Sequence, residues 1–131
     1  MDTDLPPQLS KIAHGLKIYH DPSDATIDIV AVPGFAVDPE KSWTWDGFNW
    51  LSHPDGLMKD FSQARIMLYQ YNSQYKGENS IDSPLHFFAA EFLSALEVKR
   101  ENCSERPMIF IAHSMGGLLV AQANAPSVEA V

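Results

Sequence analysis

The apolar residues of this chain fall into short runs separated by polar connections. Three runs, Ile27–Val32, Ala64–Tyr71 and Met108–Ala112, are continuous and rich in β-branched or aromatic residues. Runs of this length between turn residues predict buried strands. Residues 15–20 instead alternate between apolar and polar side chains, which predicts a half-exposed edge strand. We therefore expect four strands, with the run that ends at Ala112 among the buried ones.

A helical pattern separates the last two runs. Ser83 followed by Pro84 is typical of a helix start, with Ser83 as N-cap and Pro84 in the first helical position. Lys99 and Arg100 lie near the C-terminal end of the predicted helix, where positive charge interacts favourably with the helix dipole. Apolar residues between these ends recur at spacings of three and four, as on one helix face: Leu85, Phe88, Ala89, Phe92, Leu93 and Leu96. Two shorter helices are predicted over Leu57–Phe61 and Leu118–Ala123.

Strands that alternate with long connections predict an α/β fold with a mostly parallel sheet and flanking helices. The 131 residues are enough for one domain at most. We expect a flexible lead-in over residues 1–11, a domain over 12–124 and an atypical tail over 125–131, because Pro126 breaks the last helix.

Charge and composition exclude several classes of function. The net charge of −8 disfavours nucleic acid and anionic membranes as partners. Cys103 is the only cysteine, so no internal disulfide can form, and we expect a cytoplasmic location. No apolar run approaches the about 20 residues of a transmembrane segment. The histidines lack metal-ligand spacing and no glycine-rich stretch continues into Lys-Ser or Lys-Thr, so neither a metal nor a cofactor is expected.

An aromatic-rich connection follows Pro33 and Gly34. We expect it to fold back onto the domain, and two roles remain open for it: packing alone, or one wall of an acyl or substrate pocket. Its aromatic residues are Trp43, Trp45, Phe48 and Trp50.

The strongest chemical signal lies after the last apolar run. The sequence Ala112-His113-Ser114-Met115-Gly116 has small residues two before and two after a serine, as in a nucleophile elbow. A strand that turns sharply into a helix there exposes Ser114. The backbone N–H of Met115 would be one donor to an oxyanion, and the N–H of Phe35, after the Ile27–Val32 strand, would be the second.

With these motifs the chain resembles the α/β-hydrolase superfamily, and within it the serine esterase group of the DUF676 and SERAC-like lipases. The resemblance covers about residues 15–123. It rests on four stretches in order: Gly15–His20, Asp28–Gly34 followed by Trp43-Thr-Trp45, Ala64–Ser73, and Ile109–Gly117.

The resemblance implies hydrolysis of a carboxylic or lipid acyl ester through an acyl-serine. Ser114 would be the nucleophile, and Phe35 and Met115 would supply the oxyanion hole. His113 would pack in the turn and is not the base. A small-molecule or lipid ester is the implied substrate, and fusion to or association with further signalling domains is the implied context.

The chain departs from the family pattern at three places. Ala112 replaces the first elbow glycine, and Pro33-Gly34 replaces the usual His-Gly. The acid and the histidine should follow the serine, but residues 115–131 contain only the carboxylate of Glu129 and no histidine. We expect the N-terminal half of a hydrolase fold, truncated after the elbow. The alternative is a catalytically inactive fragment or a non-enzymatic recognition or signalling module. The remaining histidines are expected on the surface or in loops: His14, His20, His53 and His86.

Overall fold

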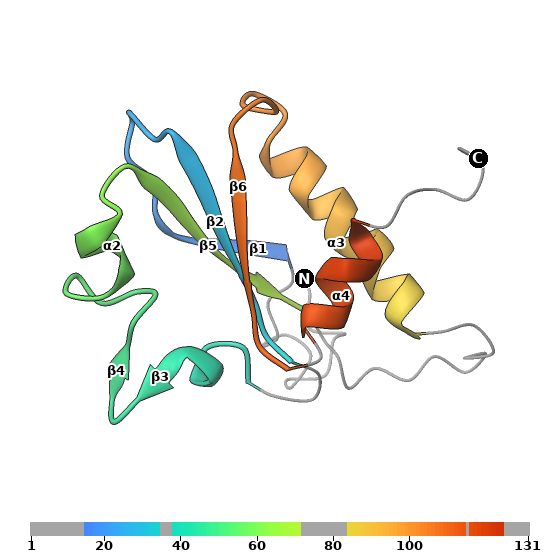
Figure 1. The fold of residues 1–131 in the computed structure, drawn as a ribbon, viewed down its shortest axis with the longest axis horizontal. Helices are drawn as coiled ribbons and strands as arrows, with labels where there is room; N and C mark the ends of the chain where they lie inside the picture. The colour runs from blue at the N-terminus through green and yellow to red at the C-terminus, as the bar shows by residue number, and fades with distance from the viewer. Residues whose placement is uncertain (1–14, 35–37, 72–83, 115, 125–131) are drawn as a thin grey trace, which may run out of the picture.

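The computed structural model describes residues 15–34, 38–71, 84–114 and 116–124 (Figure 1). The lead-in over residues 1–11, the N-cap Ser83 and the tail over 125–131 lie outside the described residues. The elements are β1 (Gly15–His20), β2 (Ile27–Val32), the 3₁₀ helix η1 (Lys41–Trp43), β3 (Thr44–Trp45), β4 (Phe48–Asn49), α2 (Leu57–Asp60), β5 (Ala64–Gln70), α3 (Pro84–Lys99), β6 (Met108–Ala112) and α4 (Gly116–Ala123).

The main sheet has the order β1-β5-β2-β6. Strands β5, β2 and β6 are parallel, and β1 pairs with β5 in the antiparallel direction. Asp28 is level with Arg65 of β5 on one side and with Met108 of β6 on the other. The predicted α/β class with a mostly parallel sheet is therefore confirmed.

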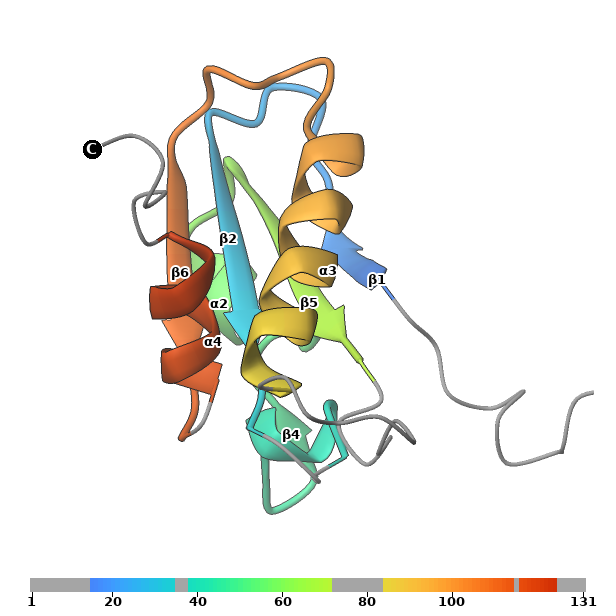
Figure 2. The ribbon, with the colours of Figure 1, turned by 90° about the vertical axis from the view of Figure 1, so that its right-hand side faces the viewer.

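Two hydrophobic clusters cover the two faces of the sheet. Helices α3 and α4 lie side by side over one face (Figure 2), where Phe92 and Leu119 pack on Val30 and Val32 of β2. On the other face, side chains from η1, α2 and the segment between them pack on Ile29, Ala31, Ala64, Ile66 and Leu68. Strands β2 and β5 are buried because both of their faces are covered.

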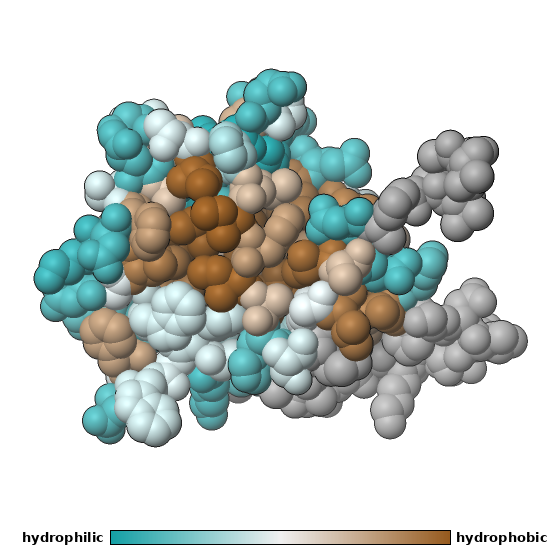
Figure 3. Space-filling model, in the orientation of Figure 1, coloured by the Kyte–Doolittle hydropathy of each residue, from teal (hydrophilic) through white to brown (hydrophobic). Residues whose placement is uncertain are grey.

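The prediction that β6 is a buried strand is wrong. In the described part of the chain β6 is the edge of the sheet, and Ile109 is 44% exposed. Apolar side chains gather on this face of the molecule (Figure 3). An apolar run gives the propensity for a strand but not the number of its neighbours. Leu93 was expected on the buried face of the helix but is 40% exposed, because α3 buries only the side turned toward the sheet.

The aromatic connection is more ordered than the sequence indicated. It contains η1 and a two-stranded hairpin, β3 paired with β4, whose turn has Asp46 and Gly47 at φ 52° and 79°. Trp43 is buried, whereas Trp45 is 83% exposed at the hairpin. The connection thus folds onto the domain through Trp43 and leaves its hairpin outside.

A buried ionic cluster joins the amino ends of the three parallel strands. Asp28 accepts hydrogen bonds from Arg65 of β5 at 2.9 and 3.0 Å, from Arg100 at 2.6 Å and from Arg106 at 2.9 Å. Burial alone would raise the pKa of the Asp28 carboxyl, but the hydrogen bonds from the three guanidinium groups outweigh it and lower that pKa. Arg100 thus binds Asp28, where the sequence assigned it to the helix dipole.

No helix in the described ranges has both the length and the apolar character needed to cross a membrane.

Candidate functional site

Ser114 lies in a tight turn between β6 and α4. Its φ angle is +56°, in the left-handed region that residues other than glycine rarely adopt. Two short backbone hydrogen bonds close the turn: Gly116 N–H donates to His113 O at 2.9 Å, and Gly117 N–H to Ser114 O at 3.0 Å. A strained serine at a strand-to-helix turn is the geometry of a nucleophile elbow, and Ser114 is exposed there.

Gly116 packs against the end of β2. A Cβ atom built on Gly116 would lie 2.5 Å from Val32 O and 2.6 Å from Pro33 O. Those are backbone atoms, which cannot rotate away. The small residue two positions after Ser114 is therefore required by the contact between the elbow and β2, as the sequence pattern indicated.

Gly34 brings the loop after β2 next to the serine. A Cβ atom on Gly34 would lie 3.4 Å from Ser114 Cβ and 3.3 Å from His113 O. The chain after β2 turns to the face covered by η1, whereas the chain after β6 turns to the face covered by α4. Adjacent parallel strands whose connections leave on opposite faces form a switch point, where open α/β sheets place their ligand sites.

The two predicted oxyanion donors, Phe35 and Met115, lie outside the described residues. The described residues beside them in sequence lie close together, because a Cβ built on Gly34 would meet Ser114 and one built on Gly116 would meet Pro33. Helix α4 begins at Gly116, so the positive end of its dipole lies beside the serine. This potential would favour negative charge developing on a bound acyl group.

His113 turns toward the aromatic connection. Its ring meets that of Trp43 edge to face, with 6.4 Å between centroids. Trp43 is 4% exposed, and among the described residues its indole N–H has no hydrogen-bond acceptor. The packing role predicted for His113 is consistent with this contact, which also attaches the aromatic connection to the elbow.

The other described histidines are engaged away from Ser114. His20 bonds to Ser62 O, His53 accepts from the N–H of Asp55, and the ring of His86 bonds to the side chain of Gln122. Across residues 15–34, 38–71, 84–114 and 116–124, Ser114 Oγ has no hydrogen-bond partner, and no three His, Cys, Asp or Glu side chains are grouped to hold a metal ion.

One residue of the site was missed by the sequence analysis. Tyr71, just after β5, donates a hydrogen bond from its hydroxyl to Pro33 O at 2.8 Å. Its position at the end of an apolar run indicated only strand packing. The hydroxyl of Tyr71 reaches Pro33 because β5 and β2 are neighbours in the sheet. The order of the strands cannot be read from the sequence, so no sequence signal marked this residue.

We found no match to this chain among protein-family models, curated proteins or solved structures. Support for a function therefore comes from the geometry around Ser114. The most informative parts of that geometry are the left-handed serine and the two glycine contacts that join it to the end of β2.

Proposed function

We propose that this chain carries the nucleophile elbow of a serine hydrolase of α/β-hydrolase type that cleaves carboxylic or lipid acyl esters. One observation carries the proposal: Ser114 adopts φ +56° at a strand-to-helix turn. The contact of Gly34 with Ser114 and the parallel order β5-β2-β6 support it. Together they match the strand–elbow–helix context in which a serine hydroxyl becomes a nucleophile.

In the proposed reaction Ser114 Oγ attacks the acyl carbon of the ester. The Oγ–carbon bond forms, the hydroxyl proton passes to a base, and the carbonyl oxygen becomes an oxyanion held by the N–H groups of Phe35 and Met115. The ester bond then breaks and the alcohol leaves with a proton. Water hydrolyses the acyl-serine by the same steps and releases the acid. We assign neither the catalytic base nor the acid that would orient it to a described residue.

The proposal is tested with the complete natural protein and p-nitrophenyl esters of graded acyl length. We expect release of p-nitrophenol to fall at least about a thousandfold in Ser114→Ala, because the nucleophile is removed. Ser62→Ala is the matched control, since Ser62 is also an exposed serine but lies before β5, outside the elbow. Equal rates in the wild type and Ser114→Ala would contradict the proposal.

A second candidate is a non-catalytic recognition module built on the same turn. It is favoured by the side chain of Ser114, whose Oγ has no hydrogen-bond partner in the described ranges, and by the described histidines, which are bonded elsewhere. The ester assay separates the two candidates. A recognition module binds an acyl ligand without turnover, so all three proteins would hydrolyse esters at the background rate.

A further inference from the structure

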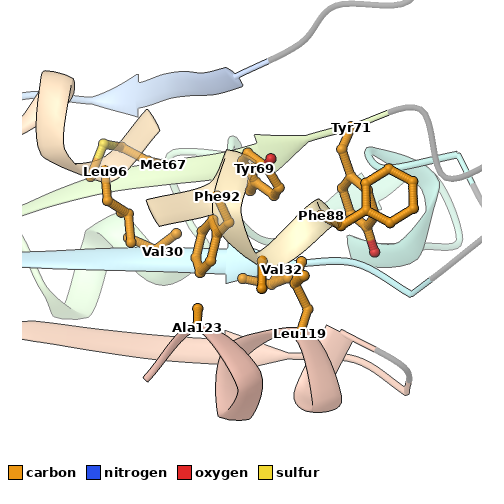
Figure 4. Packing of buried hydrophobic residues seen from close by; sticks show 11 residues of the cluster. Val30, Val32, Met67, Tyr69, Tyr71, Phe88, Phe92, Leu96, Leu119 and Ala123 are labelled. Atoms are coloured by element: carbon orange, nitrogen blue, oxygen red, sulfur yellow. The ribbon is translucent and has the colours of Figure 1, made fainter. Parts of the chain in front are cut away.

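Tyr71 connects three parts of the site that are distant in sequence. It follows β5, its hydroxyl donates to Pro33 O at 2.8 Å, and both groups are buried. Figure 4 shows Tyr71 extending past Phe88 toward the end of β2. Its ring stacks on Tyr69 with 5.2 Å between centroids and meets Phe88 edge to face at 5.3 Å. These contacts fix the ring, so the hydroxyl has a defined position.

The acceptor of this hydrogen bond is also the atom against which the elbow packs. A Cβ on Gly116 would lie 2.6 Å from Pro33 O, the oxygen that Tyr71 holds. One residue further along, a Cβ on Gly34 would lie 3.4 Å from Ser114 Cβ. The Pro33 carbonyl that Tyr71 holds is therefore one of the two backbone groups that limit how closely the turn at Gly116 approaches β2.

We infer that Tyr71 is a positioning residue that holds Pro33 and Gly34, at the end of β2, against the turn that carries Ser114. The catalytic consequence of this role rests on the proposed function, whereas its structural consequence does not. Burial raises the pKa of the Tyr71 hydroxyl, so it remains a donor throughout the pH range of ordinary assays.

The test compares Tyr71→Phe with Tyr69→Phe in the complete protein. Both changes remove one hydroxyl from the same stacked pair, but only Tyr71 bonds to Pro33. Hydrogen exchange is followed by mass spectrometry on peptides that cover residues 29–34 and 109–117, with a peptide over 57–66 as internal reference. We expect exchange to accelerate several-fold in the first two peptides of Tyr71→Phe alone. Unchanged exchange, or the same acceleration in Tyr69→Phe, would overturn the inference.

A second readout measures the catalytic consequence. The rate at which a fluorophosphonate labels Ser114 should fall about tenfold to a hundredfold in Tyr71→Phe, because displacement of catalytic groups by about 1 Å has effects of this size. Tyr69→Phe should label at the wild-type rate. Equal labelling of the two variants would overturn the positioning role. A wild type that does not label contradicts the proposed function, and the exchange comparison then decides the structural role of Tyr71 by itself.

Discussion

At the scale of single residues, the geometry around Ser114 depends on how closely the turn after β6 approaches β2. The motif around Ser114 could be read from the sequence, because the small residues at 112 and 116 are adjacent to it in the chain. The contacts of Gly34 and Tyr71 could not, since they join residues brought together by the order of the strands. Tyr71 and Pro33 are separated by 38 positions.

Two neighbouring glycines provide a direct test of this packing. Gly116→Ala places a methyl group against the carbonyls of Val32 and Pro33, whereas the same change at Gly117 meets nothing within 4 Å. We expect Gly116→Ala to lower the free energy of unfolding by about 1–3 kcal/mol, as overpacking does. Gly117→Ala should be neutral or stabilising by about 0.5–1 kcal/mol, because alanine favours a helix. Chemical denaturation measures both, and equal effects would contradict the packing.

At the scale of elements, the apolar runs predicted the strands and α3 with nearly correct bounds. β5 ends at Gln70 rather than Tyr71, and the aromatic connection contains a hairpin that its polar and aromatic composition concealed. The ionic cluster escaped prediction, although it left a signal. Asp28 and Arg65 each occupy the second position of an otherwise largely apolar strand, and parallel pairing in register brings them level.

The cluster predicts a large effect of a small change. Asp28→Asn removes the charge that three arginines share and leaves Arg65 and Arg100, both 8% exposed, without a counter-ion. We expect a loss of about 3–5 kcal/mol of unfolding free energy, as when one partner of a buried ion pair is removed. Glu40→Gln is the control, because the exposed Glu40–Lys17 pair should contribute at most about 1 kcal/mol. Similar losses in both variants would contradict this role.

The same carboxyl gives the stability a pH dependence. The pKa of Asp28 is below its ordinary value of 3.8 in the folded protein. Its contribution is therefore complete above the ordinary value and is lost as the pH falls through the lower folded value. Thermal melting between pH 7 and pH 2 should show this loss in the wild type, and Asp28→Asn should lack that part of it.

At the scale of the whole molecule, the mostly parallel sheet was predictable but the order β1-β5-β2-β6 was not. The pattern of apolar and polar residues indicates how buried each strand is. Which strands become neighbours is determined by packing across the sheet. This order puts the ends of β2 and β6 side by side with their connections on opposite faces, which makes the switch point at Ser114. The edge position of β6 has the same origin.

The exposed edge predicts a tendency to self-associate. β6 contains no charged residue, and in the described part of the chain its outer side is unpaired. Exposed apolar edge strands pair with other strands unless a charge prevents it. We expect these 131 residues to associate with increasing concentration, and Ile109→Lys to reduce that association. Val98→Lys is matched, because Val98 is 70% exposed but lies on α3. Sedimentation velocity measures the effect, and an equal reduction by both variants would contradict a role for the edge.

The central claim is that the turn between β6 and α4 presents Ser114 as a nucleophile. The most direct measurement is covalent labelling of the complete natural protein by a fluorophosphonate in a lysate of its own cells, followed by mass spectrometry of the peptide that contains Ser114. We predict an adduct on Ser114 Oγ that disappears in Ser114→Ala and persists in Ser62→Ala. An unmodified Ser114 in a lysate whose other serine hydrolases are labelled would contradict it.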